Sequence, residues 1–554
     1  MKHLITLVFI ALLVEGSGQI PFTTLPDWES NPNGYVSTGL GLADINGDGF
    51  KDIIVANGND ISRQHLVVYY NNGDGTFLPD PSWESEDIDY HGHLACGDID
   101  KDGDIDVAVS VYIGPTGFSS PGKVKVYYNQ GTQLESTPSF VSNPFYTFSC
   151  DLGDADGDGD LDLAATAGEP YGGILDHGKI FLSDSGQFQP TPQWETSIPI
   201  GSLDVEFGDF NQEGFMDVIF VCENDPASIY LANNSALIST TPAWQSAEGP
   251  IYINSVDIGY KNGTTMVVMT GNDQLGGDGK VRMYSFQQEI PPLSTADWTS
   301  FHYGYGSGIM LADLQANDTL DLVYGGWWLP INVAKGKVNG FELTPSYTSG
   351  TSSVVEAIEM ADLGKQSFEL KAFTLIPDET NAGTHVILLP DQLVEEIVSI
   401  ERNGISVGIE GYAWVPNKCW VSFKDPLVID ENIVIHYYYS PNPDMVVTNW
   451  DSSIGNYIFY NTNPPIGINN PKESDPSFIS QPFPNPASDH LYIRNTDLTN
   501  ESAVEIFNIY GGRILSKVYT GNMDVDVSGL VEGIYLVIIK NNGNIFSSKL
   551  LIER

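Results

Sequence analysis

Asp44-Ile45-Asn46-Gly47-Asp48-Gly49-Phe50-Lys51-Asp52 sets oxygen-bearing side chains at relative positions 1, 3, 5 and 9 of a short loop, with Gly at position 6. A loop of this kind can wrap its oxygen atoms around a hard cation. Ordinary turns are also rich in Asp, Asn and Gly, but a turn does not need a ligand-type side chain at every second position. The register therefore predicts a calcium loop.

The same register returns three times, in loops that begin at residues 98, 154 and 209. Successive loops therefore begin 54, 56 and 55 residues apart. Self-similarity at a fixed period indicates a repeat architecture. The fourth loop has Glu in place of Asp at position 5. We expect about four Ca²⁺ ions. Their predicted ligands are Asp44, Asn46, Asp48, Asp52, Asp98, Asp100, Asp102, Asp106, Asp154, Asp156, Asp158, Asp162, Asp209, Asn211, Glu213 and Asp217.

A second marker, an aromatic residue that in six of seven cases follows a proline by two positions, also recurs. The seven aromatic residues are Trp28, Trp83, Phe140, Trp194, Trp244, Trp298 and Tyr347. Between the markers lie short β-branched and aromatic runs bounded by turn residues, without helical periodicity. Seven all-β units of about four strands each predict a radial β-propeller.

These loops and strands resemble the FG-GAP, or VCBS, repeat of integrin α-subunit propellers and of many secreted bacterial proteins. The resemblance covers about residues 25–460 and implies a calcium-binding propeller. Its ligand pattern fades after the fourth unit, because the fifth has no carboxylate and the seventh keeps only Asp362. The sixth retains Asp313 and Asp321, which make at most a weak site.

The last unit is interrupted. Residues 394–440 fit no repeat and are expected to form an inserted β element, after which 444–450 and 456–460 again have the pattern of blade strands. We predict an all-β, seven-bladed propeller over residues 19–465, closed by the strand around Trp28, with eight blades as the alternative. Closure of this kind removes exposed strand edges.

The two ends of the chain predict export. Residues 1–18 have the pattern of a signal peptide, and no other segment is long enough to cross a membrane. Four cysteines in 554 residues are too few for a disulfide scaffold. After a linker at 466–473, residues 474–554 have the pattern of a small β-sandwich. They resemble the C-terminal sorting domain of the type IX secretion system of Bacteroidetes, which implies passage through that machinery to the outer cell surface or the medium.

Charge limits the partners. The chain has 24 Lys and Arg against 72 Asp and Glu, a formal net charge of −48. Four Ca²⁺ ions would reduce this to about −40. Such an excess argues against nucleic acid and against anionic membranes as partners, and it favours a soluble, monomeric protein.

The face opposite the predicted calcium loops is the expected ligand face, because its connecting segments are rich in aromatic and histidine residues. Flat rings on a rigid scaffold suit stacking on sugars or anchoring a protein. The alternative is that such rings pack between blades. The predicted ligand residues are Tyr35, Tyr90, His91, His93, Tyr146, Tyr252, Tyr303 and Tyr305. Trp327-Trp328 could add a platform, although adjacent strand residues point to opposite faces, so at least one should be in the core.

Three functions follow from these patterns. The favoured one is a secreted or cell-surface binding module for a glycan or an extracellular protein. The alternatives are a carbohydrate-active enzyme, such as a polysaccharide lyase or hydrolase, and a structural surface or matrix protein. No catalytic motif is present in the sequence, but a site assembled from scattered loop residues would leave none.

Overall fold

The computed structural model describes residues 20–463 except 170, 234–236, 249, 250, 275, 289 and 366, together with 488, 490–493, 501–508, 513–520, 523–531, 533–541 and 544–552. The predicted signal peptide (1–18) and linker (466–473) lie outside the described residues. The chain divides into two compact units, residues 1–463 and 464–554. Within the described residues, no helix is long and apolar enough to span a membrane.

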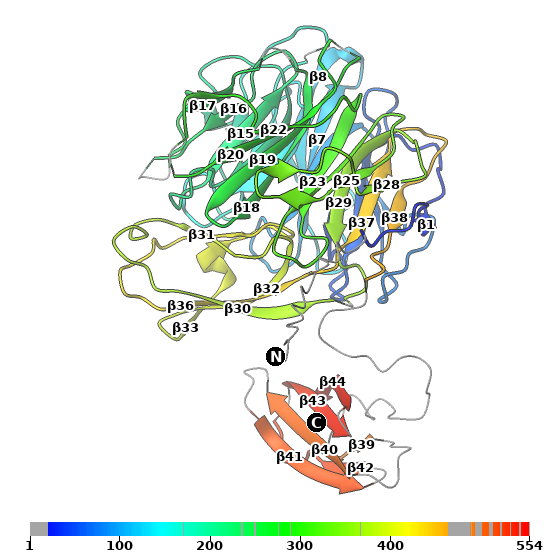
Figure 1. Cartoon of the computed structure of the whole chain (residues 1–554), viewed down its shortest axis with the longest axis vertical. Helices are drawn as coiled ribbons and strands as arrows, with labels where there is room; N and C mark the ends of the chain where they lie inside the picture. Colours follow the sequence, from blue (N-terminus) through cyan, green and yellow to red (C-terminus); the bar gives the residue numbers. More distant parts are fainter. Residues whose placement is uncertain are drawn as a thin grey trace, which may run out of the picture. The chain divides into compact units, whose positions relative to one another are not determined.

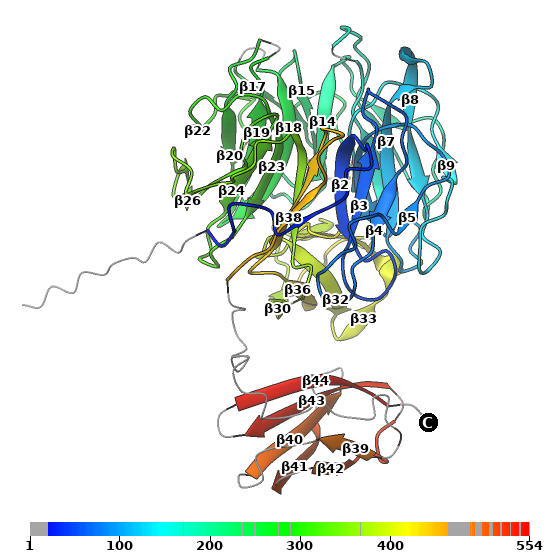
Figure 2. The same cartoon turned by 90° about the vertical axis from the view of Figure 1, so that its right-hand side faces the viewer.

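Among the described residues, the body of the first unit consists of seven sheets that each contain four antiparallel strands. Figures 1 and 2 show how these sheets are arranged. The strands of sheets 1 to 4 are β2 (Ser37–Ala43), β3 (Asp52–Asn57), β4 (Val67–Tyr69), β5 (Trp83–Glu84); β6 (Tyr90–Gly97), β7 (Asp106–Gly114), β8 (Gly117–Tyr127), β9 (Phe140–Val141); β10 (Cys150–Gly153), β11 (Asp162–Ala165), β12 (Lys179–Phe181), β13 (Trp194–Glu195); and β14 (Ser202–Gly208), β15 (Asp217–Cys222), β16 (Ser228–Tyr230), β17 (Trp244–Ser246). The short strand β21 (Leu293–Ser294) joins the edge of sheet 4 in parallel.

Sheets 5 to 7 follow the same order, with a longer connection in the last. Their strands are β18 (Ile253–Lys261), β19 (Thr264–Gly271), β20 (Val281–Phe286), β22 (Trp298–Thr299); β23 (Gly306–Ala312), β24 (Asp321–Gly326), β25 (Asn332–Ala334), β28 (Tyr347–Thr348); and β29 (Val355–Ala361), β37 (Asp444–Asn449), β38 (Tyr457–Phe459), β1 (Trp28–Glu29). A small hairpin, β26 (Gly336–Lys337) and β27 (Gly340–Phe341), lies in the chain between β25 and β28 of sheet 6.

The first strands of the seven sheets form the inner wall of the unit. They contact one another in the cyclic order β2, β6, β10, β14, β18, β23 and β29, and β29 contacts β2. Trp28 of β1 pairs with Ile458 of β38, so the N-terminal strand is the fourth strand of the last sheet, as the sequence predicts. Because the sheets are covered on both sides, second strands such as β3 and β15 are buried along their whole length and have an apolar centre. In β19 of sheet 5, Thr264 and Met266 remain partly exposed.

The recurring aromatic marker is the fourth strand of each sheet, where it packs against the next sheet. The Trp28 ring meets Tyr69 of sheet 1 at 5.8 Å, and Trp244 of sheet 4 meets Tyr284 of sheet 5 at 5.1 Å, both edge to face. Trp28 Nε1 donates to the carbonyl of Phe77 at 3.1 Å. The marker recurs once per unit because every interface between sheets needs such a contact.

The inserted element lies between β29 and β37 and is larger than predicted. One sheet has the order β30 (Glu369–Leu375), β36 (Ile433–Tyr439), β32 (Val394–Arg402), β33 (Ile405–Val407), and a second has β31 (Val386–Leu388), β35 (Trp420–Phe423), β34 (Tyr412–Ala413), preceded by the 3-10 turn Ile409–Gly411. Strand β30 pairs with β36 along seven residues, and β31 pairs with β35. Residues 369–388, which the sequence analysis placed outside the insertion, therefore belong to it.

One hydrogen-bond geometry recurs at the same end of six of the seven sheets, all except sheet 5. The Asp at loop position 9 accepts two backbone N–H groups, one from position 2 of its own loop and one from the segment that follows strand 3. For Asp52 the donors are Ile45 at 3.0 Å and Asn71 at 2.8 Å. The other described residues with this pair of bonds are Asp106, Asp162, Asp217, Asp321 and Asp444. We call this the aspartate clamp.

The described residues of the second unit form two sheets, β39 (His490–Ile493) with β42 (Met523–Asp526), and β41 (Arg513–Thr520), β40 (Glu501–Asn508), β43 (Gly533–Asn541), β44 (Asn544–Ile552). Their apolar side chains share one core that includes Leu491, Val504, Val525 and Val537. Two sheets around one core form a small β-sandwich.

The aspartate clamp can be tested in sheet 6, whose loop has the fewest carboxylates at positions 3 and 5. Asp321→Asn should lower the free energy of unfolding by about 1–3 kcal/mol, because an amide nitrogen then faces a buried N–H donor. Urea denaturation followed by circular dichroism measures the change. Asp318→Asn, the same charge change at a side chain that is 77% exposed in the same loop, should cost less than about 0.5 kcal/mol. Equal costs for the two variants would contradict the clamp.

Candidate functional site

The four acidic loops share one backbone conformation. Positions 4 and 6 both have φ in the left-handed region, where an L side chain is strained. Position 6 is Gly in all four loops, whereas position 4 accepts Lys101 and Gln212. The φ angles lie between 54° and 96° at Gly47, Gly49, Lys101, Gly103, Gly157, Gly159, Gln212 and Gly214. The sequence register identified position 6 but not the equal requirement at position 4.

The two left-handed residues bring backbone N–H groups onto the carboxylate at position 1. Asp44 accepts from Gly47 at 2.9 Å through Oδ1 and from Gly49 at 2.6 Å through Oδ2. Asp154 accepts from Gly157 and Gly159 in the same way, at 2.8 and 3.0 Å. Each loop therefore holds its first carboxylate in a fixed position before any cation is considered.

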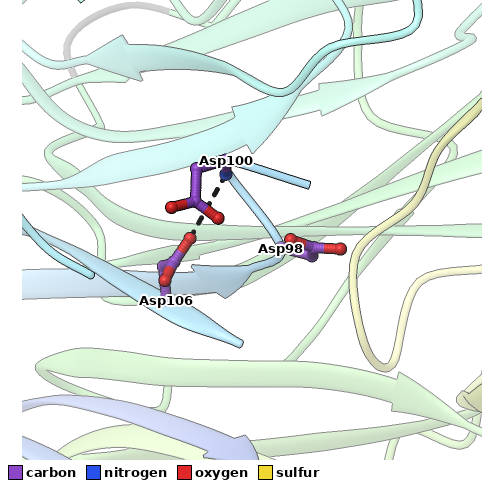
Figure 3. A group of neighbouring side chains, drawn as sticks. All are labelled: Asp98, Asp100 and Asp106. Atoms are coloured by element: carbon purple, nitrogen blue, oxygen red, sulfur yellow. Dashed lines mark hydrogen bonds between the residues drawn. The ribbon is translucent and has the colours of Figure 1, made fainter. Parts of the chain in front are cut away.

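In the second and third loops the carboxylates converge. Oxygen atoms of Asp98, Asp100 and Asp106 all lie within 4.8 Å of one another, and the same holds for Asp154, Asp156 and Asp162. Figure 3 shows the first group, with the Asp100 N–H donating to Asp106 at 3.4 Å. Asp98 Oδ1 is buried and has no hydrogen-bond partner among the described residues. An all-oxygen donor set of this density fits a hard divalent cation.

Burial makes these carboxyl groups hard to ionise. Burial raises the pKa of Asp98 to about 6, of Asp106 to about 8, and of Asp154 to about 7, with neighbouring carboxylates adding to the effect. The backbone N–H groups of the clamp act in the opposite direction but do not overcome it. A bound dication would favour the ionised form of every one of these groups.

The sixth loop keeps this fold without the ligand set. Asp313 accepts from Asn317 at 3.1 Å and from Asp318 at 2.7 Å, although positions 3 and 5 are Gln315 and Asn317. In sheet 7 the position-9 residue is Asp444, which the insertion separates from Asp362 in the sequence. Loop shape therefore comes from the backbone, and only the first four loops carry the predicted ligand types at all four positions.

The inserted element covers the end of the unit that carries these loops, which we call the loop face (Figure 2). Ser422 Oγ donates to Asp154 Oδ2 at 2.6 Å. The Gly214 carbonyl accepts from the N–H groups of His385 and Val386, both at 2.9 Å. Lys51 pairs with Glu395 at 2.5 Å. Loops 1, 3 and 4 thus each contact the inserted element directly.

One lysine of the inserted element enters the middle of the unit. Lys418 lines a central cavity of about 170 Å³ together with Asp151, Glu206, Asp257 and Glu359 of the inner strands. Its ammonium pairs with Glu206. Burial opposes the charge on Lys418, but the carboxylates of Glu206, Asp151 and Asp257 outweigh it and raise the pKa of Lys418. Lys418 therefore offsets the acidic inner wall and holds the inserted element against the loop face.

The opposite face carries an open pocket of about 350 Å³, which we call the aromatic pocket. Its aromatic lining consists of Tyr112, Phe118, Phe148, Tyr171, Tyr305, Trp327 and Trp450. Trp327 is the centre of a three-ring stack, 4.4 Å from Tyr305 and 5.0 Å from Trp450 between ring centroids. Trp327 Nε1 donates to Glu356 Oε2 at 2.6 Å, which fixes the indole in place. The pocket combines these aromatic rings with a few polar side chains, the form that ligand pockets usually take.

The predicted ligand residues are distributed unevenly around this pocket. His93 and Tyr305 line it. His91 is fully buried and its Nδ1 lies 3.1 Å from the carbonyl of Asn57, so this residue does not reach the face where we expected it. The remaining five lie outside the lining: Tyr35, Tyr90, Tyr146, Tyr252 and Tyr303.

Several of those five are held by other contacts. The Tyr35 hydroxyl donates to Glu84 at 2.7 Å, Tyr146 to the Phe118 carbonyl at 2.8 Å, and Tyr303 to the Pro330 carbonyl at 2.7 Å. Trp327 and Trp328 also differ from expectation. Trp327 is half-buried in the pocket and Trp328 is 57% exposed, so neither is in the core.

Sequence reasoning proposed Trp327 only as an addition to the ligand face and missed Trp450, although both belong to connections between the second and third strands. Tyr171, Trp327 and Trp450 each follow the second strand of their sheet. An aromatic residue at this repeat position in units 3, 6 and 7 is a signal that could have identified them.

Comparisons with known proteins agree with the two-unit description. Residues 16–109 match the FG-GAP-like repeat. Residues 481–553 match the secretion system C-terminal sorting domain. The chain therefore carries an FG-GAP-like repeat and a type IX sorting domain, and the protein is secreted or exposed at the cell surface. The search of curated proteins found no match.

Three solved structures are similar at low identity. BBS1N in complex with ARL6DN, soaked with lead, is 10% identical, with 66% of this chain and 95% of that chain covered and a TM-score of 0.40. The Dos1 propeller is 12% identical (57% and 72% covered, TM-score 0.36), and Saccharomyces cerevisiae Sqt1 is 10% identical (72% and 82% covered, TM-score 0.37). At these TM-scores, nothing about the site is transferred from them.

The raised pKa values predict how the calcium-free protein responds to pH. Asp98, Asp106 and Asp154 bind protons more tightly in the folded than in the unfolded chain. Their contribution to stability is therefore full below about pH 4 and is lost as the pH rises through about 6 to 8. The urea midpoint of calcium-free protein should fall between about pH 5 and about pH 8, and saturating calcium should reduce that fall. A midpoint that rises over this range without calcium would contradict the prediction.

Proposed function

We propose that this secreted or cell-surface β-propeller is a binding module, stabilised by Ca²⁺ in its first four loops, that recognises a glycan or an extracellular protein through the aromatic pocket. The observation that carries the proposal is the stack of Tyr305, Trp327 and Trp450 in an open pocket on the face that the inserted element leaves uncovered. Stacked rings held by a rigid scaffold bind flat apolar faces at little cost in conformational entropy.

The calcium part of the proposal is supported by the donor sets of the second and third loops and by the unpaired Asp98 Oδ1. The residues that would hold the ions are those at positions 1, 3, 5 and 9 of each loop. Bound calcium would neutralise carboxylates that the chain otherwise offsets with few cations. It would also stabilise the contact between the third loop and the inserted element, because Asp154 is both a predicted ligand and the acceptor of the Ser422 hydroxyl.

Removing calcium should lower the melting temperature strongly. Each filled site adds about 2.7 kcal/mol at a free calcium concentration about 100 times its Kd. Asp156→Ala combined with Asp158→Ala should remove one site and part of the shift, measured by differential scanning calorimetry. The control is Gln315→Ala with Asn317→Ala at the same positions of the sixth loop, which should leave the calcium-dependent shift unchanged. A melting temperature indifferent to calcium would refute the metal assignment.

The pocket part of the proposal can be tested with glycan and extracellular-protein arrays. Trp327→Ala should weaken binding of any ligand found by at least about tenfold, because it removes the centre of the stack. Trp328→Ala, which removes the adjacent exposed indole from outside the lining, should leave binding unchanged. Melting temperatures of both variants control for folding. A ligand that binds both variants as tightly as the unmodified protein would place the binding site elsewhere.

An enzyme is the second candidate, because the lining also contains the carboxyl groups of Asp60 and Glu356. Burial raises the pKa of Glu356 to about 7, with the Trp327 N–H acting against it. A carboxyl group with this pKa can act as a general acid near neutral pH. Cleavage of a polysaccharide by the calcium-loaded protein, abolished by Glu356→Gln, would favour this candidate over the binding module.

A further inference from the structure

The aromatic pocket combines rings with acidic side chains that outnumber its basic ones. Glu356, only 5% exposed, and Asp60 belong to its lining. No lysine or arginine is among the described residues that line it, and His93 is its one basic side chain. His93 interacts with Asp204, 3.9 Å from its Nδ1, as well as with Glu356. The lining therefore holds two carboxyl groups, Asp60 and Glu356, and one imidazole that is shared with a third.

Two more buried carboxyl groups stand behind the rings. Glu169, 3% exposed, accepts from the Tyr112 hydroxyl at 3.1 Å. Glu223 is 2% exposed, and its Oε2 has no hydrogen-bond partner among the described residues. Such buried carboxylates are costly unless a positive group lies near.

We infer that the aromatic pocket binds an alkylammonium group, which lies against the Trp327 stack and pairs with Glu356. This inference rests on the proposed binding function and narrows its ligand. Indole faces attract cations through the ring quadrupole, most strongly where water is excluded, and a carboxylate beside the rings adds direct charge pairing. A neutral sugar would use the rings but bring no positive charge to Glu356, and an anionic ligand would be repelled by the ionised carboxylate.

The probes are Nα-acetyl-lysine amide, its Nε-acetylated counterpart and a neutral oligosaccharide series, titrated into calcium-loaded full-length protein by calorimetry. The amine should bind, its affinity should fall with added salt, and the Nε-acetylated probe should bind at least about tenfold more weakly because it lacks the charge. Glu356→Gln should weaken amine binding by about tenfold while its amide oxygen still accepts from the Trp327 N–H. Asp273→Asn makes the same charge change on the same face outside the lining and should have little effect.

A further titration distinguishes the two possible sources of the ammonium group, a protein side chain and a small amine. A lysine-containing peptide that binds more tightly than spermidine indicates a protein side chain, whereas the reverse order indicates a small amine. Either order supports the inference.

Equal binding of the amine and its acetylated counterpart, or unchanged amine binding in Glu356→Gln, would overturn it. A neutral oligosaccharide that binds while the amine does not, with loss in Trp327→Ala, would overturn the cation inference but keep the proposed function. If no probe binds and the arrays also give no ligand, both fail.

Discussion

Buried negative charge at one end of the propeller is the constraint on which the rest of the structure depends. Each of the first four loops gathers carboxylates whose ionisation burial opposes, and the inner strands add Asp151, Glu206, Asp257 and Glu359 around the central cavity. With 72 acidic and 24 basic side chains, the protein has few lysine or arginine residues that could balance this charge. Backbone N–H groups at the aspartate clamps and the ammonium of Lys418 in the central cavity stabilise part of this negative charge. We propose that divalent cations balance the remaining loop charge.

This arrangement gives the two faces different roles. The inserted element seals the loop face, because Lys418, Ser422 and the backbone at His385 all bond to groups that the loops or inner strands present. The opposite face keeps its centre open, and four sheets contribute aromatic side chains to it. Contacts at the loop face therefore stabilise the scaffold, and we propose that recognition takes place at the other end of the same strands.

The features that the sequence predicted are the local or periodic ones. The loop register and the aromatic marker are visible because every unit needs the same turn and the same contact between sheets, as Trp28 and Tyr69 illustrate. The features it did not predict depend on contacts between distant segments. Ser422 and Asp154 are 268 residues apart, and Asp444 completes a loop that begins before the insertion. The pocket was found only in part for the same reason, since Trp327 and Trp450 meet across two sheets.

Crystals grown in calcium and measured for anomalous scattering give the most direct test of the claim that divalent ions balance the loop carboxylates. The account predicts an anomalous peak among the oxygens of each of the first four loops, with the strongest in the second and third, where three carboxylates converge. It predicts no comparable peak in the fifth unit, whose turn at Asn262-Gly263 has no carboxylate. An anomalous map that is flat at Asp98, Asp100 and Asp106 and at Asp154, Asp156 and Asp162 would contradict it.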